Sequence, residues 1–155
     1  MTKPSITILF IAHAPSPNTQ LLRDNAVDAI TNETDVSLIT KSPFDCTTEN
    51  ALAADGIIIA TTENIGAMAG ATKDFFDRTY NDLLDVSAGT PVVAYIRAGL
   101  DGTGTTRGLD AIFTGLRWRQ VAPITVLKGD WQPSFSTTAS EAALTLAAGV
   151  ELGLY

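Results

Sequence analysis

The stretch SITILFIAHAPSPNTQLL (residues 5–22) passes from an apolar run directly into turn and helix-start residues. The run at 5–12 is nearly continuous in apolar residues, which is typical of a strand covered on both faces. Ser16 stands where a helix N-cap is expected. Pro17 takes the first helical position, where its missing N–H is not needed. The stretch therefore predicts a buried strand, a short loop and a helix over 17–31.

Four further short apolar runs follow at regular intervals, and segments with helical spacing separate most of them. Strands that alternate with helices indicate an α/β doubly wound fold, and the five-stranded order 2-1-3-4-5 suits one domain of 155 residues (1–155). We predict strands at 5–12, 35–40, 56–62, 90–97 and 120–127, at most a short helix in 41–55, and helices at 17–31, 67–84, 105–117 and 138–151, the last capped by Thr138 or Ser140.

The composition limits the classes of partner. The formal net charge of −7 disfavours non-specific binding to nucleic acid or to an anionic membrane surface, since both attract positively charged proteins. No apolar run is long enough to span a bilayer. Cys46 is the single cysteine, so an internal disulfide is excluded and a reducing, cytoplasmic location is expected. Cys46 lies away from the expected ligand site, and we assign no catalytic role and no metal site.

The expected ligand site lies where the first and third strands separate. In the order 2-1-3-4-5 this switch point is flanked by the loops at 13–19 and 61–69. Hydroxyl groups and helix-start amides of the first loop would surround one point at the positive end of a helix dipole, a neutral site for an anion. An ordinary helix start explains the same residues. The donors concerned are those of Ser16, Asn18, Thr19 and Gln20, with His13 as a packing residue or a ligand contact.

The stretch TTENIGAMAGATKDFFDRTY (61–80) resembles a segment of the flavodoxin-like NAD(P)H-dependent FMN reductases. SPNTQLL (16–22) is similarly like the phosphate loop of flavodoxin-like proteins, although Pro17 stands where flavodoxins usually have glycine and removes one amide donor. The positions shared with the reductase segment are Thr61, Glu63, Gly66, Met68, Gly70, Lys73, Asp77 and Arg78.

The resemblance implies a flavodoxin-like three-layer sandwich that binds FMN without a covalent bond. It places the phosphate on Ser16, Asn18 and Thr19, with His13 and Gln20 beside it. Residues of the two later loops would line the isoalloxazine ring, largely through main-chain groups. These are Thr61, Thr62, Glu63, Asn64, Ile65 and Gly66 after the third strand, and Gly99 and Gly102 after the fourth.

The function that follows from the resemblance is electron transfer from NADH or NADPH through FMN to a quinone, a free flavin or another acceptor. The loops at 61–66 and 97–104 contain no aromatic residue, which would leave one ring face open to a nicotinamide. The cofactor carries such chemistry, so no catalytic acid, base or nucleophile is expected. Two alternatives stay open: an electron carrier of the flavodoxin type, and a cofactor-less flavodoxin-like binding protein.

Three further features have two explanations each. Phe76, Tyr80 and Leu84 form a second apolar stripe on the helix over 67–84, which either lies deep in its own fold or meets a partner. With the resemblance, the second explanation predicts a homodimer. Either Arg97 or Arg107 would contact a nucleotide phosphate, or both are solvated charges. Trp131 would either pack against its own loop or cover the flavin ring.

Overall fold

The computed structural model describes residues 5–155 as alternating strands and helices. The elements are β1 (Thr7–Ala12), α1 (Pro17–Glu33), β2 (Ser37–Lys41), the 3-10 turn η1 (Pro43–Asp45), α2 (Thr48–Leu52), β3 (Gly56–Asn64), β4 (Ala67–Met68), α3 (Gly70–Leu83), β5 (Pro91–Ala98), α4 (Thr103–Leu116), β6 (Arg119–Gln120), β7 (Thr125–Lys128) and α5 (Ser134–Glu151).

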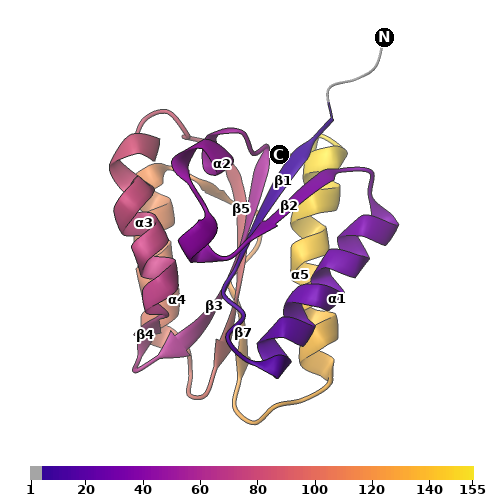
Figure 1. Cartoon of the computed structure of the whole chain (residues 1–155), viewed down its shortest axis with the longest axis vertical. Helices are drawn as coiled ribbons and strands as arrows, with labels where there is room; N and C mark the ends of the chain where they lie inside the picture. The colour runs from indigo at the N-terminus through magenta and orange to yellow at the C-terminus, as the bar shows by residue number, and fades with distance from the viewer. Residues whose placement is uncertain (1–4) are drawn as a thin grey trace.

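The main sheet is parallel, with the strand order β2-β1-β3-β5-β6. The strand β7 also pairs with β5, farther along the same edge, and β4 adds a short antiparallel pairing to β3. Helices α1 and α5 lie on one side of the sheet, and α3 and α4 lie on the other (Figure 1). The predicted three-layer α/β sandwich and the order 2-1-3-4-5 are confirmed.

Two apolar cores explain why the strand sequences lack a strict alternation. Along β1, Ile8 and Phe10 face the core under α1 and α5, whereas Leu9 and Ile11 face the core under α3 and α4. All four side chains are buried. Since both faces of the central strands are covered, consecutive positions in them are buried and mostly apolar, as in the nearly continuous run at 5–12.

The fifth strand and the last helix differ from their predicted bounds. The fifth strand, predicted at 120–127, is divided into β6 and β7, and Pro123 between them cannot donate a hydrogen bond to a neighbouring strand. The prediction of Thr138 or Ser140 as the N-cap of the last helix is wrong, because α5 begins at Ser134. The Thr138 hydroxyl donates to the Ser134 carbonyl inside the helix instead (3.2 Å).

The second apolar stripe of α3 serves the fold of the chain itself. Phe76 is only 1% exposed, and its ring lies against Phe113 and Trp118, with centroid separations of 6.3 and 6.0 Å. Tyr80 is partly buried against the same core, while Leu84 is exposed. Phe76 is therefore not available to a partner surface, and the homodimer stays a prediction.

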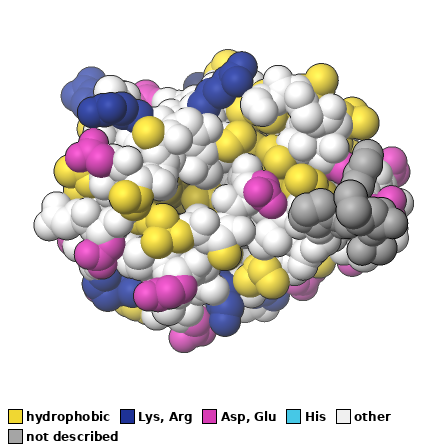
Figure 2. Space-filling view, turned by 90° about the horizontal axis from the view of Figure 1, so that it is seen from above, with side chains coloured by type: hydrophobic (Ala, Val, Ile, Leu, Met, Phe, Trp, Pro, Cys, Tyr) yellow, Lys and Arg dark blue, Asp and Glu magenta, His cyan; other side chains and the backbone are white. Residues whose placement is uncertain are grey.

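Figure 2 shows the end of the molecule at which the sheet strands begin, where acidic, basic and apolar side chains are interspersed with uncharged ones. Within residues 5–155, no helix has the length and apolar character that crossing a membrane requires.

Cys46 is buried, and this burial raises the pKa of its thiol to about 11, so the thiol is protonated at neutral pH.

The central position of β3 gives a test of the two-sided core. Ile58→Ala should lower the free energy of unfolding by about 2–5 kcal/mol, because a large side chain would be removed from a fully buried position. Urea denaturation followed by circular dichroism measures the loss. Phe44→Ala is the control: this side chain is 66% exposed, so its removal should change the free energy of unfolding by no more than about 0.5 kcal/mol. Equal losses would contradict the assigned core.

Candidate functional site

The candidate site lies at the edge of the sheet where β1, β3 and β5 end. The three loops that leave these strands come together at the lower edge in Figure 1, with the first turn of α1 and the β4 strand on either side. The predicted contacts lie at this edge: His13 and Ser16 in the loop after β1, Asn18, Thr19 and Gln20 in the first turn of α1, residues 61–64 at the end of β3, Ile65 and Gly66 in the turn that follows, and Gly99 and Gly102 in the loop after β5. Parallel strands bring loops from distant parts of the sequence to one edge, as the switch-point rule predicts.

A reciprocal pair of hydrogen bonds closes the start of α1. Ser16 is the N-cap, and its hydroxyl oxygen accepts from the Thr19 N–H (3.2 Å). The Thr19 hydroxyl oxygen accepts from the Ser16 N–H (2.9 Å), and the two hydroxyl oxygens lie 2.9 Å apart. This capping box confirms the predicted N-cap at Ser16 and the first helical position of Pro17.

The capping box engages several of the donors that the sequence assigns to an anion. The Thr19 N–H bonds to Ser16, and the Gln20 N–H donates to the Ser16 carbonyl as the first bond of the helix (2.9 Å). Among residues 5–155, the Asn18 N–H is the one of the three predicted amides without a partner. The Thr19 hydroxyl donates to the Ser16 carbonyl (3.0 Å), and Thr19 is only 8% exposed. The hydroxyls of Ser16 and Thr19 and the Asn18 amide lie close together at the positive end of α1.

His13 continues the strand pairing at this edge. Its N–H donates to the Ala60 carbonyl (3.0 Å), which extends the β1–β3 ladder by one residue. Partial burial lowers the pKa of the imidazole from its ordinary value, because burial disfavours the charged form.

Residues 63–68 form a β-hairpin that the sequence analysis missed. Glu63 pairs with Met68 and Asn64 with Ala67, and the turn residues Ile65 and Gly66 have φ values of 52° and 76°. Two consecutive residues at positive φ are typical of a type I′ hairpin turn. The predicted helix over 67–84 therefore begins three residues later, at Gly70.

The hydroxyls of Thr61 and Thr62 fix the base of this hairpin. The Thr61 and Thr72 hydroxyl oxygens lie 2.8 Å apart in a buried contact that joins β3 to α3. The Thr62 hydroxyl donates to the Asn64 side-chain oxygen (2.8 Å). Both threonine side chains are thus engaged within the chain, and both residues are buried.

The Glu63 side chain connects the hairpin to the loop that follows β5. One carboxylate oxygen accepts from the Leu100 N–H (3.0 Å) and the other from the Gly102 N–H (2.8 Å). In the same loop the Thr103 N–H donates to Asp101 (3.0 Å), and this bond holds the pKa of the Asp101 carboxyl below its usual value. The carboxylate of Glu63 is therefore bound to protein amides.

Gly104 is a structural residue of the site that the sequence analysis did not single out. A Cβ atom on Gly104 would overlap the carbonyl oxygen of Gly66, so the first turn of α4 lies directly on the hairpin turn. Gly66 and Gly99 differ from it, because a Cβ atom there would meet no atom within 4 Å. The main chain is thus open to a ligand at Gly66 and at Gly99, one residue in each loop.

Arg97 and Trp131 belong to the packing beside the site. The Arg97 guanidinium donates to the carbonyls of Ala98 (2.7 Å) and Leu127 (3.0 Å) and lies 4.9 Å from the centre of the Phe135 ring. Trp131 packs edge-on against Phe135, with a centroid separation of 5.7 Å. Arg97 is therefore no solvated charge, and Trp131 packs its own loop. Arg107 lines a hollow of about 310 Å³ beside α4, with Asp101, Thr103, Thr106 and Asp110.

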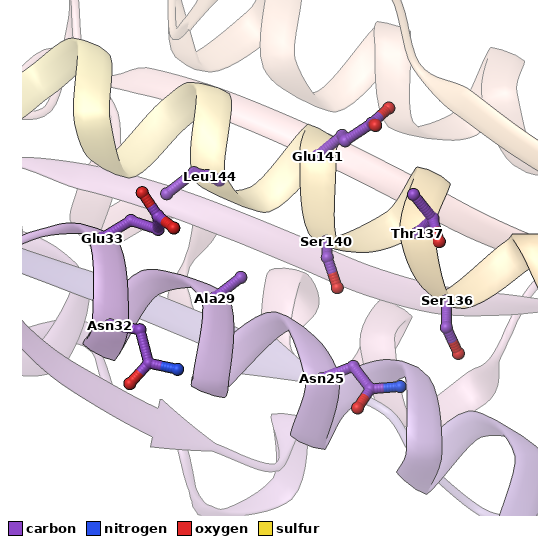
Figure 3. Close-up of a pocket in the computed structure, with 9 residues that line it drawn as sticks. All are labelled: Asn25, Ala29, Asn32, Glu33, Ser136, Thr137, Ser140, Glu141 and Leu144. Atoms are coloured by element: carbon purple, nitrogen blue, oxygen red, sulfur yellow. The ribbon is translucent and has the colours of Figure 1, made fainter.

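A second hollow, of about 390 Å³, lies between α1 and α5 and shares no residue with the three loops. Figure 3 shows its polar lining, with Ser136 and Ser140 pointing from α5 toward α1. No hydrogen-bond partner for these two hydroxyls is found in the part of the chain that the structure describes. The residues that line it are Asn25, Ala29, Asn32, Glu33, Ser136, Thr137, Ser140, Glu141 and Leu144.

The residues at the strand ends fit the two parts of a flavin nucleotide. Hydroxyl and amide donors at a helix start suit a phosphate monoester, since they donate to an anion at the positive end of a dipole. The open main chain at Gly66 and Gly99 suits the close approach of a flat ring.

The contact between the hairpin and α4 gives a second test. Gly104→Ala should lower the free energy of unfolding by about 1–3 kcal/mol, because the added methyl group meets backbone that cannot rotate away. Thermal and urea unfolding measure the loss. Gly99→Ala is the matched control in the adjoining loop, and it should be nearly neutral since the space beside Gly99 is open. A neutral Gly104→Ala would show that the hairpin does not rest on α4.

The fold, but no family, is identified by comparison with known proteins. No model of a protein family matches the sequence, and no curated protein matches it either. A flavodoxin from the domain Archaea superposes with a TM-score of 0.79 at 14% identity, covering 94% of this chain and 99% of that chain. An NADH:FMN oxidoreductase in its apo form gives a TM-score of 0.71 at 16% identity, covering 96% and 90%.

An NADPH-quinone reductase from P. pentosaceus also matches, with a TM-score of 0.65 at 14% identity over 90% of this chain and 96% of that chain. These three neighbours are 14–16% identical to the chain, so they show its fold alone. The chain has the flavodoxin-like fold.

Proposed function

We propose that this chain binds FMN at the edge where β1, β3 and β5 end and acts as a flavin-dependent oxidoreductase with NADH or NADPH as the electron donor. The observation that carries the proposal is the set of uncharged donors at the start of α1, gathered at the switch point of a flavodoxin-like sheet. Names of structural neighbours, an NADPH-quinone reductase and an NADH:FMN oxidoreductase, support the same class of function.

The phosphate would be held by Ser16, Asn18 and Thr19, with His13 and Gln20 beside it. A hydrogen bond to a charged group contributes about 1.5–3 kcal/mol, and a helix dipole adds about 0.3–1 kcal/mol. The net charge of −7 opposes an anion, but salt screens charges that lie more than about 8 Å away. Several local donors therefore outweigh the more distant surface charges.

The ring would lie against the main chain of the hairpin and of the loop after β5. Its neighbours are Thr61, Thr62, Glu63, Asn64, Ile65 and Gly66 on one side, and Gly99 and Gly102 on the other. These loops carry no aromatic side chain to cover the second ring face, so a nicotinamide or an acceptor can stack there. Bound FMN supplies two-electron chemistry, and the protein residues bind and orient the reactants.

A cofactor-less binding protein is the second candidate, and one observation favours it. Ser16 and Thr19 satisfy one another in the capping box, so the start of α1 is complete without a ligand. Pro17 also lacks an N–H at this position. Under this candidate the chain would be a flavodoxin-like scaffold that recognises another molecule.

Absorbance and turnover separate these candidates. We expect the purified chain to show flavin absorbance, or to bind added FMN with quenching of flavin fluorescence, and to oxidise NADH or NADPH at steady state with a quinone as acceptor. Binding of FMN without oxidation of either nucleotide would indicate an electron carrier. A colourless chain that leaves FMN fluorescence unchanged would overturn the proposal in favour of the scaffold.

Thr19 tests the phosphate contact. Thr19→Ala should weaken FMN binding roughly 10- to 100-fold, because it removes one donor to a charged group. It should leave the affinity for riboflavin unchanged, since riboflavin has no phosphate. The same change should lower the free energy of unfolding by about 1 kcal/mol through loss of the cap.

Thr19→Ser is the matched variant, because it keeps the hydroxyl and should retain both FMN affinity and stability. Fluorescence titration and urea denaturation measure the two effects. Equal weakening of FMN and riboflavin by Thr19→Ala would contradict the phosphate assignment.

A further inference from the structure

Glu63 links two loops that are distant in sequence. Its carboxylate accepts from the N–H groups of Leu100 and Gly102, which lie 37 and 39 residues farther along the chain. Each oxygen takes one of the two bonds, at 3.0 and 2.8 Å. Hydrogen bonds with an ionised acceptor are stronger than those between neutral groups. The arrangement is therefore a two-point attachment of one loop to the other.

The loop after β5 is shaped to present these two amides. Gly102 has a φ of +69°, a conformation that L side chains rarely adopt, and a Cβ atom there would come within 2.7 Å of Val126. The nearby Asp101 carboxylate accepts from Thr103 within the same loop, so it does not take part in the attachment. Leu100 is 75% exposed, so its side chain adds little apolar burial to hold this loop.

The hairpin meets the same loop region at a second place. The carbonyl of Gly66 lies against Gly104 in the first turn of α4, where a side chain on residue 104 would not fit. The hairpin is thus joined to the β5–α4 region by a charged attachment at Glu63 and by close main-chain contact at its tip. The two loops are thus in contact at two separate places.

We infer that Glu63 is a positioning residue that fixes the two walls of the ring site relative to one another before the flavin binds. The part of this inference that concerns the ring rests on the proposed function. A site that is ordered in advance avoids the loss of loop freedom on binding, and this raises affinity without any new contact to the ligand. Glu63 therefore favours flavin binding through Leu100 and Gly102 rather than through its own contact with the ring.

The attachment itself can be measured without any flavin. In the apo protein, Glu63→Ala should speed the hydrogen exchange of the Leu100 and Gly102 amides by about tenfold or more, because their acceptor is removed. Glu63→Gln keeps one carbonyl oxygen and should give an intermediate rate. Glu141→Ala on α5 is the matched control, and the amide of Ile58 in β3 is the internal reference for global stability; neither should change.

Two results would contradict the assignment of the Glu63 carboxylate as the group that joins the two loops. Unchanged exchange at Leu100 and Gly102 in Glu63→Ala would show that the carboxylate does not protect these amides. An equal acceleration at Ile58 would show a general loss of stability in place of a local one.

The role toward the ring is tested by titration with FMN and with riboflavin. Glu63→Ala should raise both dissociation constants by the same factor, about tenfold, because the walls of the ring site act on both ligands alike. Thr19→Ala provides the contrast, since it should affect FMN alone. Unchanged affinities in Glu63→Ala would overturn the positioning role even if the exchange result holds.

The two proposals fail in different ways. If the native chain binds neither FMN nor riboflavin, the proposed function is wrong, and the ring-site role of Glu63 is wrong with it. The exchange of Leu100 and Gly102 still decides whether Glu63 joins the two loops.

Discussion

Burial of the central strands on both faces is the constraint from which the site follows. Side chains of β1, β3 and β5 alternate between two cores, so a shift of one strand by one residue would exchange every side chain between the cores. In the observed register, Ala12 of β1 pairs with Ala60 of β3, and Thr62 of β3 pairs with Arg97 of β5. The ends of these strands are thereby held at one level, and the loops that leave them are brought within reach of one another. The arrangement of the site is in this sense a consequence of how the sheet is packed.

Glycine marks the points where those loops touch. Gly104 admits the carbonyl of Gly66, and Gly102 allows the turn that presents two amides to Glu63. Ile65 shows the opposite situation. It is a β-branched residue at a positive φ, its side chain is fully exposed, and no core contact offsets the strain of this conformation. Such a residue at the rim of a site is compatible with selection for contact with a molecule outside the chain.

The sequence predicts the layers and the start of α1 because these depend on local patterns. It predicts the strand order because, of the two usual doubly wound orders, the five-stranded one suits a chain of this length. Continuous apolar runs indicate buried parallel strands, and Ser16 followed by Pro17 indicates a helix start. The hairpin at 63–68 was missed because helical spacing continues through the small residues Ala67 and Ala69, while the turn depends on Ile65 at an unusual φ. The bonds of Glu63 could not be predicted, since their partners are nearly forty residues away. The placement of Glu63 beside a flavin ring, largely through its main chain, stays a prediction, and its carboxylate is bound to protein amides.

Competition between the cap and a ligand determines whether the start of α1 can bind a phosphate. A phosphate would have to replace the bond that the Thr19 hydroxyl donates to the Ser16 carbonyl (3.0 Å), which contributes about 0.5–1.5 kcal/mol, whereas the Ser16 hydroxyl oxygen can keep accepting from the Thr19 N–H. Each donor turned toward a phosphate would contribute about 1.5–3 kcal/mol, so two hydroxyls and the Asn18 amide together would exceed the loss of that bond. The missing N–H of Pro17 removes one possible donor but does not change the sign of this balance. The capping box is therefore compatible with phosphate binding: it orders Ser16 and Thr19 in the free chain, and the same hydroxyls can donate to the anion once it arrives.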